Sequence, residues 1–205
     1  MGGDSSLVDG VQIQGVSLKL LRKHTDSRGS FTEVFQSSWD TCISPVQWSV
    51  VSSKPSTFRG MHLHRKHDEY ICCLDGCCFV GLVDLRPALQ DGVSDTRTLP
   101  WSMYKLHCQE PAVLTFPADI LHGWYFPETS THLQAVSESY EKYSSYDNHG
   151  VRWDDIDLPF SWPFDSCHVS DKAQSFPVMK ELLTKLQPST TTHVALESER
   201  SLGSS

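Results

Sequence analysis

Short segments rich in β-branched, aromatic and cysteine residues fill the middle of this chain, and they constrain its fold more than any other feature. Each segment is bounded by Gly, Pro, Asp or Ser, which is typical of strands separated by turns. The segments are Val46–Ser53, Tyr70–Cys73, Cys77–Asp84, Pro111–Phe116 and His132–Ser139. Many short strands at this spacing predict an all-β sandwich or barrel.

Two further local patterns stand out. The dipeptide Asp75-Gly76 lies between two of these segments and predicts a β-hairpin, because Gly readily takes a positive φ. Apolar residues recur at helical intervals between Pro177 and Pro188, which predicts one short helix near the end of the chain.

A total of 205 residues is enough for one ordinary domain with its own core. We expect a flexible N-terminus over residues 1–14 and a single domain over residues 15–187. The Ser/Thr-rich remainder, residues 188–205, has almost no core-forming content, so a disordered tail is expected there.

The composition excludes several classes of protein. The chain has 17 Lys and Arg against 25 Asp and Glu, and this net charge of −8 argues against nucleic acid as a partner. No apolar run approaches the roughly 20 residues of a membrane-spanning helix, so a membrane partner is not expected. The first residues lack the basic and apolar regions of a signal peptide, which favours a cytoplasmic location.

Seven cysteines are present, and four of them flank the Asp75-Gly76 turn in a CC-x3-CC pattern. Such a pattern can bind soft metals. Neighbouring side chains on a strand point to opposite faces, however, so the four sulfur atoms do not converge. We therefore expect Cys72, Cys73, Cys77 and Cys78 to pack in the core as small apolar residues.

The histidines are more informative. His62 and His64 are two residues apart, so on a strand they share one face. A carboxylate, Glu69, follows on the next expected strand, and a third imidazole, His122, comes from a later one. Such a set suits Fe, Mn, Ni or Zn in the divalent state, with one or two coordination positions open. The alternative is that the three histidines are hydrogen-bonded polar residues of a barrel interior.

This spacing resembles the first motif of the cupin superfamily, His-x-His-x(3,4)-Glu-x6-Gly. The matching residues are His62, His64, Glu69 and Gly76. The second cupin motif is matched only at Pro117 and His122. The resemblance implies an all-β double-stranded β-helix, or jelly roll, here with a short C-terminal helix.

Five blocks over most of the chain resemble, in the same order, those of the dTDP-4-dehydrorhamnose 3,5-epimerases. The blocks are Asp26–Phe35, Gln47 with Arg59–His62, Val83–Arg86, Phe116–Trp124, and Gly150–Asp155 with Trp162-Pro163. This family has a cupin fold, is usually dimeric and acts on a nucleotide-linked 4-keto-6-deoxy sugar. The resemblance therefore implies an isomerase without an organic cofactor, with a nucleotide-sugar and a second copy of the chain as partners.

The resemblance also implies roles for individual residues. His62 matches the family's base, which removes a proton next to the ketone, and Asp155 matches the carboxylate that orients this base. His122 matches a second active-site histidine. The residues that match positions around the substrate are Arg28, Glu33, Gln47, Arg59 and Gln134.

Three departures from the family pattern bear on the chemistry. Glu69 stands where the family has the Lys that stabilises the enolate, Gln134 replaces the Tyr acid, and His64 replaces a Gln. Two of these changes, at positions 64 and 69, complete the metal motif. A divalent ion held by His62, His64, Glu69 and His122 could polarise the ketone in place of the lysine.

The two interpretations compete for His62, because a nitrogen that binds a metal is not available as a base. With a metal bound, the base would be His67, Tyr140 or a hydroxide on the ion. The first hypothesis is an epimerase-type isomerase. The alternatives are a metal-dependent cupin enzyme of another class, such as an oxygenase, lyase or cyclase, and a non-catalytic sugar-binding cupin.

Overall fold

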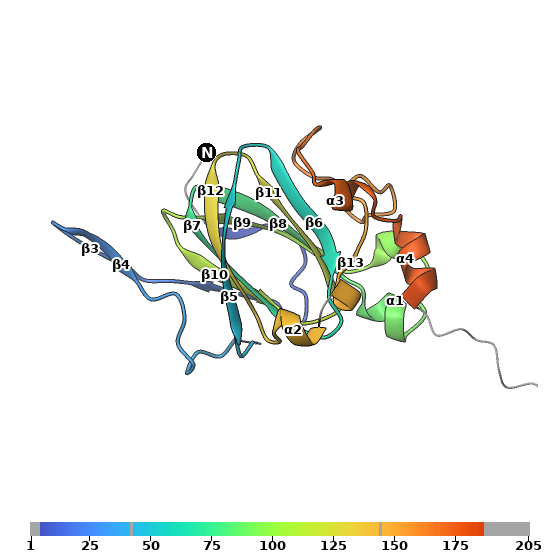
Figure 1. The fold of residues 1–205 in the computed structure, drawn as a ribbon, viewed down its shortest axis with the longest axis horizontal. Helices are drawn as coiled ribbons and strands as arrows, with labels where there is room; N and C mark the ends of the chain where they lie inside the picture. The colour runs from blue at the N-terminus through green and yellow to red at the C-terminus, as the bar shows by residue number, and fades with distance from the viewer. Residues whose placement is uncertain (1–4, 42, 144, 187–205) are drawn as a thin grey trace, which may run out of the picture.

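Two antiparallel sheets face each other and form a jelly-roll barrel in the computed structural model, which describes residues 5–41, 43–143 and 145–186 (Figure 1). The six-stranded sheet has the order β1 (Ser6–Gly10), β9 (Trp101–His107), β8 (Cys77–Asp84), β11 (Ile120–Phe126), β6 (Thr57–Leu63), β13 (His149–Gly150). The five-stranded sheet has the order β2 (Ser17–Leu20), β10 (Ala112–Phe116), β7 (Glu69–Asp75), β12 (Ser130–Val136), β5 (Gln47–Ser53). The predicted all-β jelly roll is confirmed.

Helices are few and short. They are α1 (Arg86–Gln90), α2 (Tyr140–Tyr143), α3 (Asp171–Gln174) and α4 (Met179–Leu186), with single 3₁₀ turns at Thr96–Thr98 and Ser145–Asp147. The helix predicted between Pro177 and Pro188 is α4. None of the helices in the described ranges has the length and apolar character needed to span a membrane.

The central strands of the six-stranded sheet, β8 and β11, are buried on both faces, which is why they contain few polar residues. The sheet's inner face packs against the five-stranded sheet through residues such as Leu82, Tyr104 and Phe126. Its outer face is covered by the C-terminal segment, with Trp162 and Leu182 among the covering residues. Strand β11 is accordingly buried along its whole length.

Alternation along β6 sets the direction of the histidines. Met61 and Leu63 point outward into the core under the C-terminal segment, and both are fully buried. The residues between and after them, His62 and His64, therefore point into the barrel. The expectation that these two imidazoles share one face is confirmed.

The Asp75-Gly76 turn differs from the prediction. Gly76 does take a positive φ of 71°, but the flanking strands do not pair with each other. Strand β7 pairs with β10 and β12, whereas β8 pairs with β9 and β11. The turn therefore carries the chain from one sheet to the other, and the predicted hairpin is wrong. The four cysteines around it are all buried, as expected for core residues.

The beginning of the domain also differs from the prediction. Residues 6–10 form β1, which pairs with β9 and is the edge strand of the six-stranded sheet, so the expected flexible N-terminus is wrong over this stretch. Ile13, which follows, is buried in the core between the sheets. The predicted tail, residues 188–205, lies outside the described residues.

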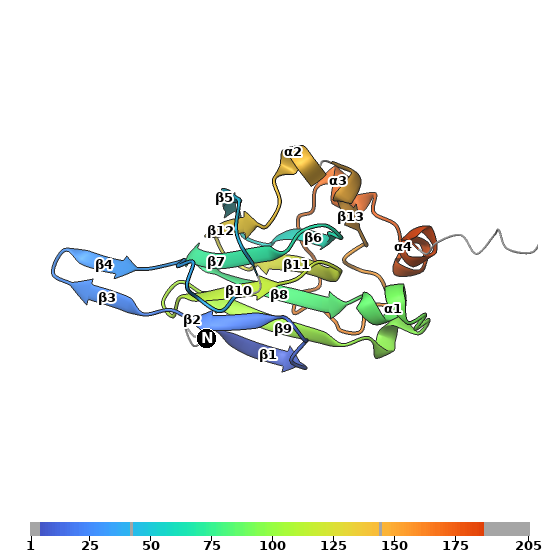
Figure 2. The same cartoon turned by 90° about the horizontal axis from the view of Figure 1, so that it is seen from below.

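A two-stranded hairpin, β3 (Lys23–Asp26) with β4 (Gly29–Thr32), extends away from the barrel. Figure 2 shows it projecting at the end opposite to α1 and α4. Most of its residues are exposed, including Phe31 with 64% of its surface accessible. The hairpin therefore has no core of its own.

Candidate active site

A cavity of about 230 Å³ opens between the two sheets, at the end where β6 and β12 finish. Its lining residues are Val51, Arg59, His62, His64, Glu69, Trp124, Gln134, Tyr143 and Asn148. Five of them, Arg59, His62, His64, Glu69 and Gln134, were singled out from the sequence as substrate-site, base or metal-motif positions. The cavity brings these residues into one place from three strands.

Three imidazoles converge beside this cavity. His62, His64 and His122 each offer a ring nitrogen, and these three nitrogens lie within 4.8 Å of one another. The register explains the meeting, since His122 of β11 lies directly opposite His62 of β6. The rings are 5.3 to 6.1 Å apart between centroids.

Hydrogen bonds to backbone carbonyls set two of the tautomers. The Nδ1 atom of His64 lies 2.8 Å from the carbonyl oxygen of Asp147, and that of His122 lies 3.0 Å from the carbonyl oxygen of Ile120. A carbonyl oxygen only accepts, so both Nδ1 atoms carry the proton. In the neutral ring the Nε2 atom then has a lone pair, and Nε2 of His122 is buried without a hydrogen-bond partner.

Burial keeps these rings neutral. It lowers the pKa of His62 to about 3, with smaller contributions from the charges of His64, Lys172 and Arg59. It also lowers the pKa of His122 and of His64, and for His64 the nearby Glu69 partly offsets this. Near pH 7, all three rings therefore have an unprotonated nitrogen available to a proton or a metal ion.

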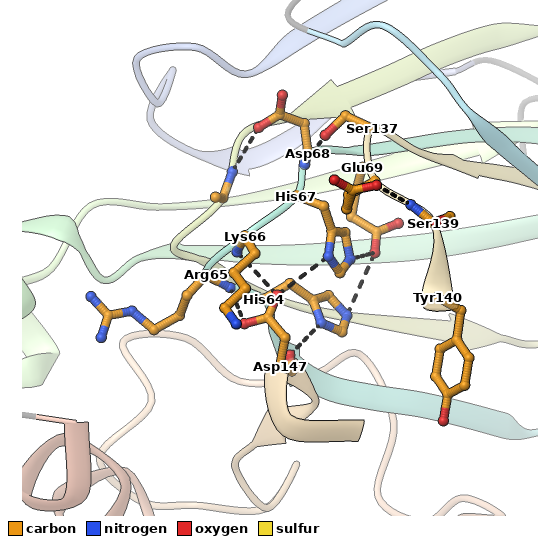
Figure 3. Close-up of polar contacts among 12 residues, drawn as sticks. His64, Arg65, Lys66, His67, Asp68, Glu69, Ser137, Ser139, Tyr140 and Asp147 are labelled. Carbon is orange, nitrogen blue, oxygen red and sulfur yellow. Dashed lines mark hydrogen bonds and ion pairs between the residues drawn. The ribbon is translucent and has the colours of Figure 1, made fainter. Parts of the chain in front are cut away.

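Glu69 lies in a second network, which Figure 3 shows. Its Oε1 atom is 3.5 Å from Nε2 of His64 and 3.3 Å from Nε2 of His67. Nδ1 of His67 lies 3.3 Å from a carboxylate oxygen of Asp147, and Asp147 also accepts hydrogen bonds from the backbone N–H groups of Arg65 and Lys66. His67 is thus held between two buried carboxylates.

Glu69 also accepts a hydrogen bond of 3.0 Å from the side-chain amide of Gln134. Its oxygens lie outside the group of three imidazole nitrogens within 4.8 Å of one another. The structure therefore places Glu69 beside the cavity and next to His64, with its closest contacts in the network of His67 and Gln134.

Arg59 supplies the positive charge at the cavity. Its guanidinium donates hydrogen bonds of 3.0 Å to the hydroxyl of Ser53 and to the backbone carbonyl of Ser52. The same side chain lines a second cavity of about 420 Å³, which lies along β6 towards His168 and also reaches His62. Arg59 is therefore placed where the two cavities meet.

Asp155 does not take the predicted place beside His62. Its carboxylate accepts hydrogen bonds from the backbone N–H groups of Met179 and Asp157. The first residue of α4 has no carbonyl partner inside its own helix, and Asp155 supplies one. Within the described residues no hydrogen bond joins Asp155 to His62, so the predicted orienting contact is wrong for this structure.

Three of the predicted substrate-binding residues lie away from the cavity. The Oε1 atom of Gln47 accepts a hydrogen bond from the backbone N–H of Tyr140. Arg28 lies on the projecting hairpin and forms an exposed ion pair with Asp26. Glu33 follows the hairpin and is also exposed.

The sequence did not indicate several lining residues. Tyr143 and Asn148 come from the segment around α2, whose position depends on contacts distant in sequence. Trp124 lies on β11, two residues after His122, and this spacing places both side chains on one face. This two-residue spacing is the sequence pattern that could have predicted Trp124 as a lining residue. Tyr140, considered as a base, is 50% exposed and points away from the imidazoles (Figure 3).

Comparisons with known proteins all lead to the same family of sugar epimerases. The sequence model of the dTDP-4-dehydrorhamnose 3,5-epimerase family matches residues 10–181. An enzyme of that name from Sinorhizobium fredii is 29% identical over 200 residues, covering 91% of this chain and 98% of the relative. The spore coat polysaccharide biosynthesis protein SpsL of Bacillus subtilis is 30% identical over 152 residues, covering 73% of this chain and 96% of that protein.

Among solved structures, dTDP-4-dehydrorhamnose 3,5-epimerase from Bacillus anthracis, crystallised with TDP and PPi, is 25% identical. The alignment covers 86% of this chain and 100% of that one, with a TM-score of 0.68.

Proposed function

This chain belongs to the dTDP-4-dehydrorhamnose 3,5-epimerase family, and we propose that it inverts a carbon next to the ketone of a nucleotide-linked 4-keto-6-deoxy sugar. The observation that carries this proposal is the position of His62. It is a neutral, half-buried imidazole that lines a cavity large enough for a sugar ring. None of its ring nitrogens is engaged in a hydrogen bond with the described residues.

The chemistry follows from what lines the cavity. His62 removes the proton from the carbon next to the ketone, and the negative charge passes to the ketone oxygen. Arg59 is the lining residue that carries a permanent positive charge, which suits either this oxygen or a phosphate of the nucleotide. His122 lies behind His62 and presents a second neutral nitrogen.

The test uses a dTDP-linked 4-keto-6-deoxy sugar in heavy water, followed by proton NMR. We expect deuterium to enter at a carbon next to the ketone, together with the signals of an inverted product. A purified, folded protein that exchanges neither carbon is not an epimerase of this substrate class.

We also propose that the protein forms a homodimer through part of its exposed apolar surface. Trp48 and Val50 lie on the edge strand β5 and Val46 directly precedes it; the three alternate along the chain and are 41%, 67% and 60% exposed, so they form one apolar row. Such a row on an edge strand is typical of a protein–protein contact. The projecting hairpin carries Arg28 away from its own cavity, and Glu33 directly follows the hairpin, which suits a contact with a neighbouring copy (Figure 2).

Light scattering after gel filtration tests this homodimer. The wild type is expected to elute as a dimer and the variant Val50→Lys as a monomer. Ile156→Lys is the matched control, because Ile156 is also an exposed apolar residue, at 90%, but lies far from β5 in sequence. A monomeric wild type at micromolar concentration would refute the dimer.

A second candidate function rests on the three imidazole nitrogens. Ligands of one transition-metal ion lie about 2 Å from it and therefore at most about 4 Å apart. The separation of up to 4.8 Å requires only small ring movements. The buried lone pair of His122, which has no protein donor, is the observation that fits a bound cation.

The ion held by His62, His64 and His122, with Glu69 beside His64, would be Fe, Mn, Ni or Zn in the divalent state. When bound, it polarises a carbonyl oxygen as a Lewis acid. His62 would then no longer serve as the base. This assignment favours a metal-assisted isomerase or a metal-dependent cupin enzyme of another class.

Elemental analysis of protein purified from metal-supplemented medium decides between the two candidates. The metal assignment predicts about one ion per chain in the wild type and none in His122→Asn. His24→Asn, on the exposed hairpin, is the control and should retain the metal. Absence of stoichiometric metal in the wild type leaves His62 as the base.

A further inference from the structure

Inversion of a carbon requires a second group besides the base. One group removes the proton from one face, and another delivers a proton to the opposite face. Gln134 stands at the position where the resemblance places the acid, and an amide has no proton to transfer at a useful pKa. The cavity must therefore supply the acid from elsewhere.

Among the residues that line the cavity, Tyr143 is the one phenol. It lies on α2, just after β12 and so at the rim of the barrel (Figure 1). The imidazole of His64 lies between the rings of His62 and Tyr143. Its centroid is 6.1 Å from that of His62 and 6.3 Å from that of Tyr143. The base and the phenol thus reach the cavity from different elements.

The ring of Tyr143 is held in place on two sides. It stacks on His67 with ring centroids 4.2 Å apart, and it meets Tyr140 edge-to-face at 5.4 Å. His67 is itself fixed between Glu69 and Asp147. The phenol is therefore positioned before any substrate binds.

The hydroxyl of Tyr143 is not used by the protein. It makes no hydrogen bond within the described part of the chain, and the side chain is only 9% exposed. A phenol carries its proton at neutral pH, so this hydroxyl is a proton donor. Among the other lining groups, the Nδ1 proton of His64 goes to a carbonyl and the Gln134 amide goes to Glu69. The remaining N–H groups, of Trp124, Asn148 and Arg59, are far too weakly acidic to deliver a proton.

We propose that Tyr143 is the proton donor of the epimerisation, in place of the phenol that is missing at position 134. This inference rests on the proposed function. The C–H bond on the side of His62 breaks and its proton moves to the imidazole. A new C–H bond forms on the opposite face with the phenolic proton, after which the imidazolium loses a proton to water and the phenolate gains one.

The variant Tyr143→Phe tests this assignment in the heavy-water experiment described above. It removes one oxygen that has no protein partner, so the fold should be unaffected. Without the donor, the enolate can be protonated only from the side of His62. We expect deuterium exchange with retained configuration to continue within a few-fold of the wild-type rate, while inversion falls by about 100-fold or more.

Tyr140→Phe is the matched control. Tyr140 lies on the same helix and is half exposed, and it does not line the cavity. Both exchange and inversion should keep their wild-type rates in this variant. Recovery of inversion in the double variant Tyr143→Phe/Gln134→Tyr would further support a phenol as the donor.

Two outcomes overturn the proposal. One is inversion by Tyr143→Phe at the wild-type rate, and the other is a parallel loss of exchange and inversion, which would indicate a role in substrate binding. Failure of the proposed function gives a different result, because the wild type itself then shows no exchange.

Discussion

The two walls of the cavity use the same residue types in opposite ways. On the imidazole wall, formed by β6 and β11, His62, His64 and His122 present ring nitrogens without protein donors. On the carboxylate wall, formed by β7, β12 and the loop before β7, Glu69 is surrounded by partners: His67 and Gln134 contact it directly. On the first wall ring lone pairs are left open to the cavity, and on the second the oxygens of Glu69 are engaged by the protein.

This difference separates reactivity from rigidity. A histidine whose lone pair faces a cavity is available to a proton or an ion, whereas a histidine between two carboxylates holds other groups in place. Substitutions on the imidazole wall should therefore change activity, and substitutions on the carboxylate wall should change stability first. The four predictions below test this division, from the largest expected effect to the smallest.

The largest effect is expected for His62→Asn. Removing the base should lower kcat/KM for the dTDP-linked sugar by about 100- to 10,000-fold, the usual contribution of a general base. Steady-state kinetics measure the effect, and the melting temperature should remain near that of the wild type. A loss of less than about 10-fold would remove His62 from the reaction.

His67→Phe should mainly affect stability. The phenyl ring keeps the stacking on Tyr143 but leaves Glu69 and Asp147 without their shared partner. Leaving a buried polar group without its partner costs about 1–3 kcal/mol, and two carboxylates are affected, so we expect a loss near the upper value. Urea unfolding measures this. An unchanged free energy of unfolding would show that His67 does not hold the carboxylate wall together.

His132→Phe should change the dependence of stability on pH. Burial lowers the pKa of His132 to about 4, so the folded protein keeps this ring neutral, while the unfolded chain binds a proton below about 6.5. The folded state is therefore fully stable with respect to this group above the unfolded pKa. Its free energy of unfolding falls as the pH drops from about 6.5 towards 4, because the unfolded chain binds the proton first. The loss amounts to about 3 kcal/mol.

The phenyl ring can take the same place, since His132 stacks on Phe126 at 5.2 Å and both of its nitrogens are buried without partners. Urea unfolding at pH 7 and at pH 4 should show a smaller acid-induced loss in His132→Phe than in the wild type. Equal losses in the two proteins would mean that His132 already binds a proton in the folded state.

The smallest effect is expected outside both walls. Asp155→Ala removes the acceptor for the backbone N–H groups of Met179 and Asp157, and a lost hydrogen bond of this kind costs about 1–2 kcal/mol. Differential scanning calorimetry measures it as a lower melting temperature. An unchanged melting temperature would indicate that the carboxylate does not anchor α4.

The fold class and part of the site could be predicted because they depend on local periodicity. The two-residue spacing of His62 and His64 fixes a common face on any strand, and the apolar spacing after Pro177 fixes a helix. The Asp75-Gly76 turn shows the limit of this reasoning. The turn itself is local, but which strands pair on either side depends on β10, β12, β9 and β11, which come later in the chain.

The positions of Asp155 and Gln47 differ from the prediction for a related reason. Asp155 and Gln47 carry acceptor oxygens that a backbone N–H can also use, and in the folded chain each accepts such a bond. Sequence reasoning identifies a group capable of a role but not the competing donor. Tyr143 was missed in the opposite way, because nothing local indicates that α2 lies against the cavity.

The covering of the six-stranded sheet by the C-terminal segment has a consequence for synthesis. The ribosome produces all the barrel strands, up to β13, before it produces Trp162, α3 and α4. Nascent barrels therefore expose Leu63, Leu121 and their apolar neighbours until the last segment emerges and docks. Premature termination after β13 would yield a barrel with one bare apolar face, and such chains are expected to depend on chaperones or to aggregate.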